Sequence, residues 1–189
     1  MINYDREKLI NAIIYFLKKT KYCGKTKLFK LLYFLDFEHF KQTGKSVTGL
    51  EYFTWKFGPV PQKLYKELEN PSRDLSENFI IHKYDNNNID DEFQIFQIKS
   101  RKKFNDEHFS EREIGILQKI AEIYKNVRAK DMTEITHLKT VPWHKTLKEK
   151  GELAKIDYML AIDNSSESLK KEIIEERITE MEEMKRVFD

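Results

Sequence analysis

The sequence predicts an α+β fold that is mostly helical, with a central buried helix surrounded by helices and a small antiparallel sheet of about three strands. Residues 26–42 are apolar around most of the helical circumference, which is typical of a central helix. Amphipathic patterns of helical period lie before and after this segment. Three short β-type segments, at 50–57, 79–84 and 92–99, supply the strands.

The first helix is predicted over residues 4–20, where an apolar stripe follows helical spacing at Ile10, Ile13, Ile14 and Leu17. Gly24 breaks the connection that follows. The central helix then runs to about Gln42, and Gly44 supplies its C-terminal stop.

Asp36 interrupts the apolar wall of the central helix. It points away from the lysine side of that helix, which is formed by Lys27, Lys30 and Lys41. A carboxylate placed there needs hydrogen-bond partners. Two interpretations stay open: a structural buried acid that ties the helix to a neighbouring backbone N–H or to His39, or an acid at the floor of a binding groove.

The segment 50–57 alternates like a strand, with Phe53, Trp55 and Phe57 on one face and Tyr52, Thr54 and Lys56 on the other. Gly58-Pro59 is expected to end it, because proline cannot donate to a strand ladder. Pro61 then suits the first turn of a helix that reaches about Glu69.

The middle of the chain combines strands with short helices. Strands 79–84 and 92–99 enclose a polar loop at 85–91. Ser110 with Glu113 has the spacing of a capping box that begins a helix. Shorter helices are predicted at 131–138 and from Pro142-Trp143 to Lys150.

Asn164, with Glu167 three residues later, is expected to open the last helix. Its apolar stripe consists of Leu169, Ile173, Ile174, Ile178, Met181, Met184 and Phe188. We therefore divide the chain into a domain at 1–163 and a C-terminal amphipathic helix at 164–189. This helix either docks on its own domain or binds a partner, including a second copy of the chain as a homodimer.

The stretch from Lys25 to Pro61 resembles the signature of the Panacea domain, the SocA-like antitoxin family that also includes phage-associated proteins. The resemblance is carried by KLFKLLYFLDFEH, TGKSVTG and GPVP, which contain Lys27, Leu28, residues 30–34, Asp36, Gly44, Thr48, Gly49 and residues 58–61. It extends to about Asp163 and includes Pro142 and Trp143. It implies an antitoxin of a toxin–antitoxin pair, with a role in phage defence, that neutralises a cognate toxin by direct contact, with no catalysis and no cofactor.

We expect the partner surface to be aromatic, because aromatic side chains bury a large area at low entropic cost. The candidate partner-binding residues are Tyr52, Trp55, Phe57, Pro59, Tyr65 and Trp143. Trp55, Phe57 and Trp143 have a competing interpretation as core residues, which makes Tyr52 and Tyr65 the better surface candidates.

Composition limits the remaining function classes. The 189 residues carry a net charge of +2 and one cysteine, Cys23, which indicates a reducing, cytoplasmic setting without disulfides or a membrane span. The sequence contains no nucleotide-binding, zinc or hydrolase motif, so no metal is expected. The alternatives are a proteolytic adaptor that delivers the toxin to a protease, a DNA-binding autoregulator that contacts nucleic acid, and a hydrolase.

Overall fold

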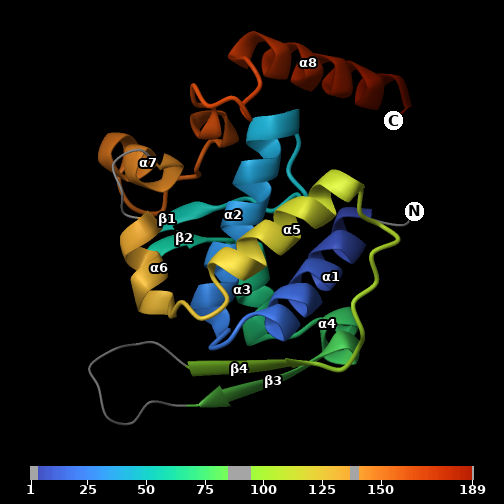
Figure 1. Ribbon diagram of the computed structural model, residues 1–189, viewed down its shortest axis with the longest axis vertical. Helices are drawn as coiled ribbons and strands as arrows, with labels where there is room; N and C mark the ends of the chain where they lie inside the picture. Colours follow the sequence, from blue (N-terminus) through green and yellow to red (C-terminus); the bar gives the residue numbers. More distant parts are fainter. Residues whose placement is uncertain (1–3, 85–94, 137–140, 189) are drawn as a thin grey trace.

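The computed structural model describes residues 4–84, 95–136 and 141–188 (Figure 1). The described residues form eight α-helices, a short 3₁₀ helix and four strands in two separate antiparallel pairs. The predicted fold class, α+β and mostly helical, is confirmed. The pair β3–β4 lies at one end of the molecule and helix α8 at the other (Figure 1).

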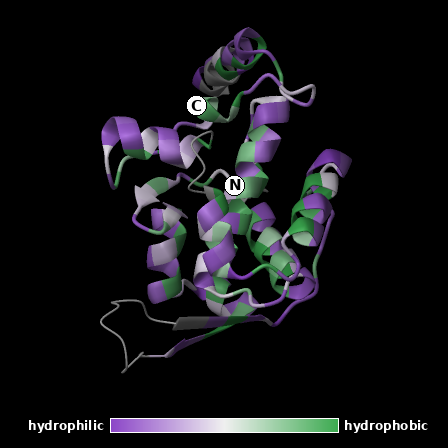
Figure 2. Ribbon diagram, turned by 60° about the vertical axis from the view of Figure 1, so that its left-hand side comes forward, coloured by the Kyte–Doolittle hydropathy of each residue, from purple (hydrophilic) through white to green (hydrophobic). Residues whose placement is uncertain are grey.

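Helix α2 (Lys25–Thr43) runs through the centre of the fold, as predicted. Helix α1 (Tyr4–Lys19) packs beside it, together with helix α5 (Glu111–Ile123) and the 3₁₀ helix η1 (Tyr158–Ala161). Most α2 side chains are buried. Figure 2 shows hydrophobic and hydrophilic bands alternating along the surrounding helices, which bury one face each. Gly44 ends α2 in the left-handed conformation (φ 78°), which glycine adopts without a Cβ penalty.

The aromatic segment forms a hairpin, not the single strand predicted for 50–57. Strand β1 (Phe53–Trp55) pairs with strand β2 (Gly58–Val60), so Gly58-Pro59 begins a strand where it was expected to end one. Thr54 lies opposite Pro59, but its N–H donates to Ala154 (2.9 Å) and its carbonyl accepts from Leu153 (2.7 Å). Thr54 therefore bonds on its other side, and the missing N–H of Pro59 leaves no gap in the ladder.

The second strand pair is β3 (Phe79–Tyr84) with β4 (Ile95–Ser100). It does not join β1–β2, so the prediction of one sheet of about three strands is wrong in this detail. The free edge of β1 is taken by the segment around Lys155, which leaves it closed to a further strand. The predicted loop at 85–91 and the first residues of the strand predicted at 92–99 lie outside the described residues.

Helix α3 (Gln62–Glu69) follows the hairpin as predicted, whereas helix α4 (Arg73–Asn78) was not predicted. Arg6 on α1 fixes α4 by an ion pair with Asp74 (2.7 Å) and also pairs with Glu67 of α3 (2.6 Å). The hydrogen bond from Arg6 is the main cause that holds the pKa of Asp74 well below its usual range. A short helix is stabilised there by a partner that is distant in sequence.

Helix α5 starts with the predicted capping box, in which Ser110 accepts from the Glu113 N–H and Glu113 accepts from the Ser110 N–H. Helix α6 (Ala129–Thr136) and helix α7 (Pro142–Lys150) follow. The last two residues of the helix predicted at 131–138 lie outside the described residues. Gly151 ends α7 as expected.

Helix α8 (Lys171–Phe188) starts later than the predicted cap at Asn164. Side-chain to backbone hydrogen bonds among Asp163, Ser165 and Ser168 hold the preceding segment in turns, and such bonds compete with helix formation. The Glu167 carboxylate pairs with Lys119 of α5 (3.2 Å) instead of capping the helix.

Candidate partner-binding pocket

Four of the six candidate partner-binding residues line one pocket. Trp55, Phe57, Pro59 and Tyr65 come together where the β1–β2 hairpin and α3 meet the first turns of α2. We call this cavity of about 80 Å³ the Trp55 pocket; Lys25, Thr26, Phe29, Lys30, Lys56 and Val60 complete its lining. Trp55 and Phe57, which the sequence predicts on one face of the strand, therefore lie together around a cavity.

Aromatic rings that are tilted against each other form the wall of the Trp55 pocket. The ring centroids of Trp55 and Tyr65 are 4.9 Å apart, and those of Phe29 and Tyr65 are 6.3 Å apart. The Phe57 side chain is 40% exposed at the hairpin turn, whereas Pro59 is buried. The pocket thus combines a fixed aromatic wall with an exposed phenylalanine.

Lysine side chains approach these rings. The Lys25 ammonium lies 4.3 Å from the centroid of the Tyr65 ring, and that of Lys56 lies 5.3 Å from the centroid of Phe57, both in cation–π range. Lys30 is 1% exposed, and its Nζ donates to the carbonyl of Phe57 at 2.5 Å. Desolvation lowers the pKa of Lys30 to about 8, because burial disfavours the charged form.

Tyr52 does not belong to this pocket, and its expected surface position is wrong. The side chain is fully buried at 0% exposure, and its hydroxyl donates to Asp36 at 2.7 Å. The alternation along the hairpin is correct, but the inward face is that of Tyr52 and Thr54, not that of Trp55 and Phe57. The pattern separates two faces without revealing which one the rest of the chain covers.

Trp143 is also far from the surface, with an exposure of 2%. It lies in the first turn of α7, and its backbone N–H donates to the hydroxyl of Tyr33 at 3.2 Å. Its structural place is the contact between α7 and α2, which matches the competing interpretation of Trp143 as a core residue.

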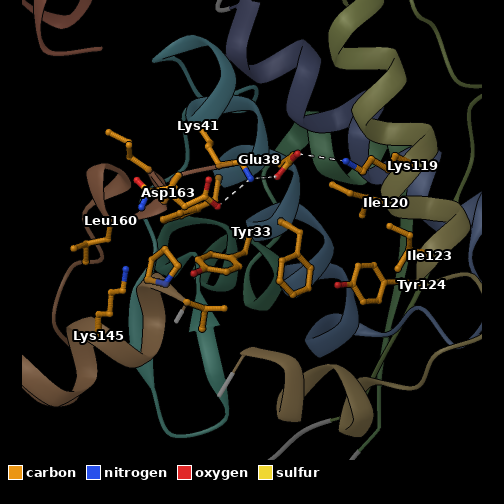
Figure 3. Close-up of a pocket in the computed structure, with 17 residues that line it drawn as sticks. Tyr33, Glu38, Lys41, Lys119, Ile120, Ile123, Tyr124, Lys145, Leu160 and Asp163 are labelled. Atoms are coloured by element: carbon orange, nitrogen blue, oxygen red, sulfur yellow. Dashed lines mark hydrogen bonds and ion pairs between the residues drawn. The ribbon is translucent and has the colours of Figure 1, made fainter. Parts of the chain in front are cut away.

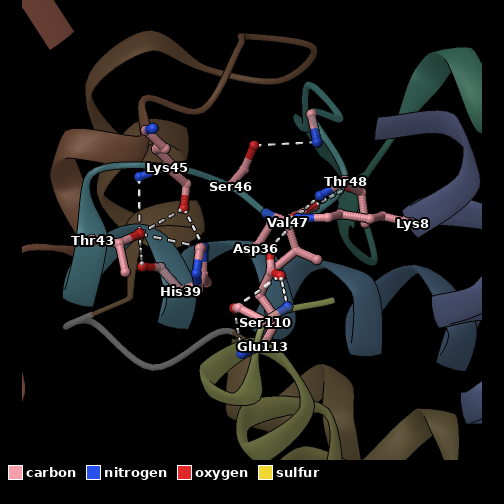
Figure 4. Close-up of polar contacts among 11 residues, drawn as sticks. Lys8, Asp36, His39, Thr43, Lys45, Ser46, Val47, Thr48, Ser110 and Glu113 are labelled. Atoms are coloured by element: carbon pink, nitrogen blue, oxygen red, sulfur yellow. Dashed lines mark hydrogen bonds and ion pairs between the residues drawn. The ribbon is translucent and has the colours of Figure 1, made fainter. Parts of the chain in front are cut away.

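Asp36 is a fully buried acid that accepts four hydrogen bonds, and Figure 4 shows it beside Val47 and Thr48. Its Oδ1 accepts from the backbone N–H groups of Val47 (2.9 Å) and Thr48 (2.7 Å). Its Oδ2 accepts from the hydroxyls of Thr48 (2.5 Å) and Tyr52 (2.7 Å). Burial raises the pKa of Asp36 to about 6, although all four bonds favour the charged form. The side chain ties α2 to the turn that follows it.

His39 is not a partner of Asp36 in this arrangement. Its Nδ1 lies 2.7 Å from the carbonyl oxygen of Lys45 and 3.3 Å from the hydroxyl of Thr43 (Figure 4). Desolvation lowers the pKa of His39, so burial favours its neutral form. His39 and Asp36 therefore hold two different parts of the same turn.

A second, larger concavity lies between α2, α5, α7 and η1 (Figure 3). We call it the α2–α5 groove; its volume is about 690 Å³, and its floor includes the stacked rings of Phe34 and Tyr124, with centroids 5.0 Å apart. Its charged residues largely pair with each other: Glu38 lies near Lys41 (3.4 Å) and Lys119 (3.6 Å), and Lys41 lies near Asp163 (3.3 Å). None of the candidate partner-binding residues lines this groove.

The buried lysines are the feature that sequence reasoning missed. Lys27 is 0% exposed, and its Nζ donates to three backbone carbonyls, those of Lys21 (2.7 Å), Tyr124 (2.7 Å) and Val127 (2.6 Å). The sequence predicts Lys27 and Lys30 on the lysine side of an otherwise apolar helix. Lysine in a mostly buried helix is itself a signal, because its charge needs acceptors.

The described residues give no support for a metal site, a reactive thiol or a membrane-spanning helix. They contain no group of three or more His, Cys, Asp or Glu side chains placed to hold a metal ion. Burial raises the pKa of the Cys23 thiol to about 11, which disfavours the reactive thiolate. No helix within the described ranges has the length and apolarity to cross a bilayer.

The comparisons with known proteins give one match. The family model described as "Antitoxin SocA-like, Panacea domain" matches residues 28–144, which is more than half of the 189 residues. The matched region runs from the first turn of α2 to α7, and it includes the hairpin and α3. No curated protein and no solved structure matches the chain.

Proposed function

Because the chain belongs to the SocA-like antitoxin family with a Panacea domain, we propose that it neutralises a cognate toxin by direct protein–protein contact. Membership of this family is the observation that carries the proposal. All lining residues of the Trp55 pocket except Lys25 and Thr26 lie within the matched region, and the pocket presents aromatic side chains around a concave site. Such pockets are typical anchoring points in protein interfaces.

The contact would be centred on Phe57 and the Trp55 pocket. Phe57 is exposed at the hairpin turn, and the hairpin is held from behind by the hydrogen bonds of Thr54 to residues 153 and 154. A rigid turn loses little conformational freedom when a partner binds. An exposed aromatic on such a support is therefore favoured as an interface residue over the buried Tyr52 and Trp143.

The proposal is tested by co-expressing the chain with a toxic protein encoded next to its gene. The wild-type chain is expected to restore growth and to bind the toxin in a pull-down experiment. If it does neither, the antitoxin function is wrong.

Two variants locate the contact, Phe57→Ala and Tyr65→Ala. We expect at least about a tenfold loss of toxin affinity in each, since truncation of a central interface aromatic costs about 1–2 kcal/mol or more. Tyr84→Ala is the matched control, because Tyr84 is an aromatic that is 50% exposed on β3, outside the pocket. Unchanged affinity in both pocket variants would place the contact elsewhere.

We also propose that residues 164–189 form a contact unit separate from the domain at 1–163. Ile174 is fully buried and Arg177 donates to the carbonyl of Thr43 (3.0 Å), but Ile173 is 38% exposed. An exposed apolar residue on a terminal helix favours the adaptor function or a homodimer contact. Deleting residues 164–189 should leave toxin binding intact while it abolishes proteolytic turnover of the toxin or dimer formation.

A further inference from the structure

The described lining of the Trp55 pocket contains positive charge and no negative charge. Three lysines, Lys25, Lys30 and Lys56, line it together with apolar and aromatic side chains, and no carboxylate is among its described lining residues. Glu69, one turn after Tyr65 on α3, lies outside this lining; desolvation and then Glu69 raise the pKa of Tyr65. The pocket therefore offers apolar walls and hydrogen-bond donors to a ligand.

Lys30 lacks the acceptors that its buried ammonium requires. An ammonium has three N–H donors. Lys27, one turn earlier on α2, uses its donors on three carbonyls, whereas within the described residues Lys30 has the Phe57 carbonyl alone. Both side chains are at most 1% exposed, so they differ in the number of acceptors and not in burial. A buried charge with one neutral acceptor is costly, and an anion beside it would offset the cost.

Trp55 adds a second donor to the lining. Its indole Nε1 is buried and has no hydrogen-bond partner among the described residues. Buried indole N–H groups in proteins are usually paired. Trp55 and Lys30 both line the pocket, so each brings an incompletely paired donor to its lining.

The start of α2 contributes to the same electrostatic preference. Lys25 and Thr26 are the first two residues of α2, and both line the pocket. The N-cap residue, Gly24, provides no side-chain cap, and the first turn contains no acidic residue. The positive end of the helix dipole is therefore uncompensated beside a pocket that already contains three ammonium groups.

The size of the cavity limits the apolar part of the ligand. Its volume is about 80 Å³, and an apolar cavity of about 150 Å³ admits a benzene ring. The Trp55 pocket thus has room for an aliphatic side chain but not for a large aromatic group.

We propose that the Trp55 pocket binds a carboxylate joined to a compact aliphatic group, and that this ligand is the C-terminal residue of a partner polypeptide. The carboxylate accepts from Lys30 and the Trp55 indole, and the aliphatic side chain packs against the aromatic wall. The polypeptide source is favoured because Phe57 and Lys56 are exposed beside the pocket and provide contact area for the preceding residues. A small free acid contacts only the pocket, so it gains little binding free energy from the surrounding surface. The identity of the polypeptide as the toxin rests on the proposed function.

The chemical class is tested with three probes of the same shape: 4-methylpentanoate, 4-methylpentanamide and 4-methylpentylamine. Ligand-observed NMR titrations of the full chain should give at least about tenfold tighter binding for the acid than for the amide, and no binding of the amine. Equal binding of the acid and the amide would overturn the proposal.

The source is tested with a five-residue peptide that ends in leucine, prepared with a free carboxylate and with a C-terminal amide. The free-carboxylate peptide should bind more tightly than both its amide and 4-methylpentanoate. Tighter binding of 4-methylpentanoate than of the peptide would overturn the polypeptide source.

Lys30→Met keeps the length of the side chain and removes its charge, so binding of the acid should be lost. Lys63→Met is the matched control, because Lys63 is an exposed lysine on α3 that does not line the pocket. Trp55→Phe removes the indole N–H while keeping an aromatic ring, and should weaken binding of the acid at least about threefold. This variant provides the test if Lys30→Met does not fold. Retained acid binding in the folded variants would overturn the proposal.

These experiments use no toxin, so their failure leaves the antitoxin function standing. Conversely, if the wild-type chain fails to rescue growth, the antitoxin function is wrong, but the binding of the probes is not affected. The two proposals therefore fail by different measurements.

Discussion

Replacing Asp36 separates the role of its acceptor oxygens from the cost of its buried charge. In Asp36→Ala, the N–H groups of Val47 and Thr48 lose their acceptor, Oδ1, in a fully buried site. Each unsatisfied buried donor costs about 1–3 kcal/mol, so the free energy of unfolding should fall by about 2–6 kcal/mol. The hydroxyls of Thr48 and Tyr52 are less demanding, because a hydroxyl can rotate and can also accept.

Asp36→Asn should be much milder. An asparagine Oδ1 can keep the two backbone N–H bonds, and its amino group can donate to the oxygens of Thr48 and Tyr52, which now accept. The variant also removes a charge from a site without exposure. We expect a loss below about 1.5 kcal/mol, since the geometry is kept and one unfavourable desolvation disappears.

The pH dependence of the free energy of unfolding provides a second measurement that compares the wild type with Asp36→Asn. Burial raises the pKa of Asp36 to about 6 from its ordinary value of 3.8, so between these values the folded state binds more protons than the unfolded state. The contribution of this group to stability is therefore full below about pH 4 and is lost as the pH rises through about 6. Two pKa units correspond to roughly 3 kcal/mol, so the stability of the wild type relative to Asp36→Asn should fall by up to that amount between pH 4 and 7.

Urea denaturation followed by circular dichroism at pH 4, 5.5 and 7 measures these differences. The comparison with Asp36→Asn is needed because the depressed pKa values of Asp74 and Glu113 give slopes of the opposite sign in both proteins. Equal destabilisation by alanine and asparagine at pH 7 would refute the assignment of the acceptor role. A difference between wild type and Asp36→Asn that does not change with pH would refute the raised pKa.

Three further predictions concern α2. Lys27→Met leaves three backbone carbonyls without their buried donor, and should lower the free energy of unfolding by about 2–5 kcal/mol in urea denaturation, whereas the exposed Lys63→Met should change it by less than about 0.5 kcal/mol. Gly44→Ala forces a Cβ into a left-handed residue (φ 78°) and should cost about 1–2 kcal/mol; an unchanged melting temperature would contradict this. Burial lowers the pKa of Lys30 to about 8, so its charge destabilises the folded state less as the pH rises from about 8 to 10.5. Over this range the free energy of unfolding of the wild type should rise by up to about 3 kcal/mol relative to that of Lys30→Met. A difference that stays constant with pH would contradict the lowered pKa.

Local patterns predicted most of the helices. The periodicity of 4–20, the nearly continuous apolar surface of 26–42 and the Ser110–Glu113 capping box each depend on residues within a few turns, and each is found in the structure. The sequence did not predict elements and strand edges that are determined by residues distant in the chain. Helix α4 is fixed by Arg6 from the start of the chain, and the edge of β1 is closed by residues about 100 positions later.

The candidate pocket was only partly predictable for the same reason. Sequence reasoning identified the aromatic residues of the hairpin and Tyr65, because their type and spacing are visible locally. It assigned the inward face wrongly, since alternation is symmetric and burial is decided by what packs against the hairpin. The lysines could not be placed, because the acceptors of Lys27 at Tyr124 and Val127 lie about 100 residues away.

Three charged side chains of α2 are at most 1% exposed, and they can be understood from the backbone groups around them. Asp36 accepts from the N–H groups of the turn after α2, and Lys27 donates to carbonyls in the segments after α1 and α5. Both satisfy main-chain groups that have no partner in a helix or strand, which a buried backbone requires. Among the residues that the structure describes, Lys30 has a single carbonyl acceptor, and it lines a pocket. Within one helix, two charges are saturated by the fold and the third is not, and it is the unsaturated charge beside a cavity that indicates binding of a ligand from outside the chain.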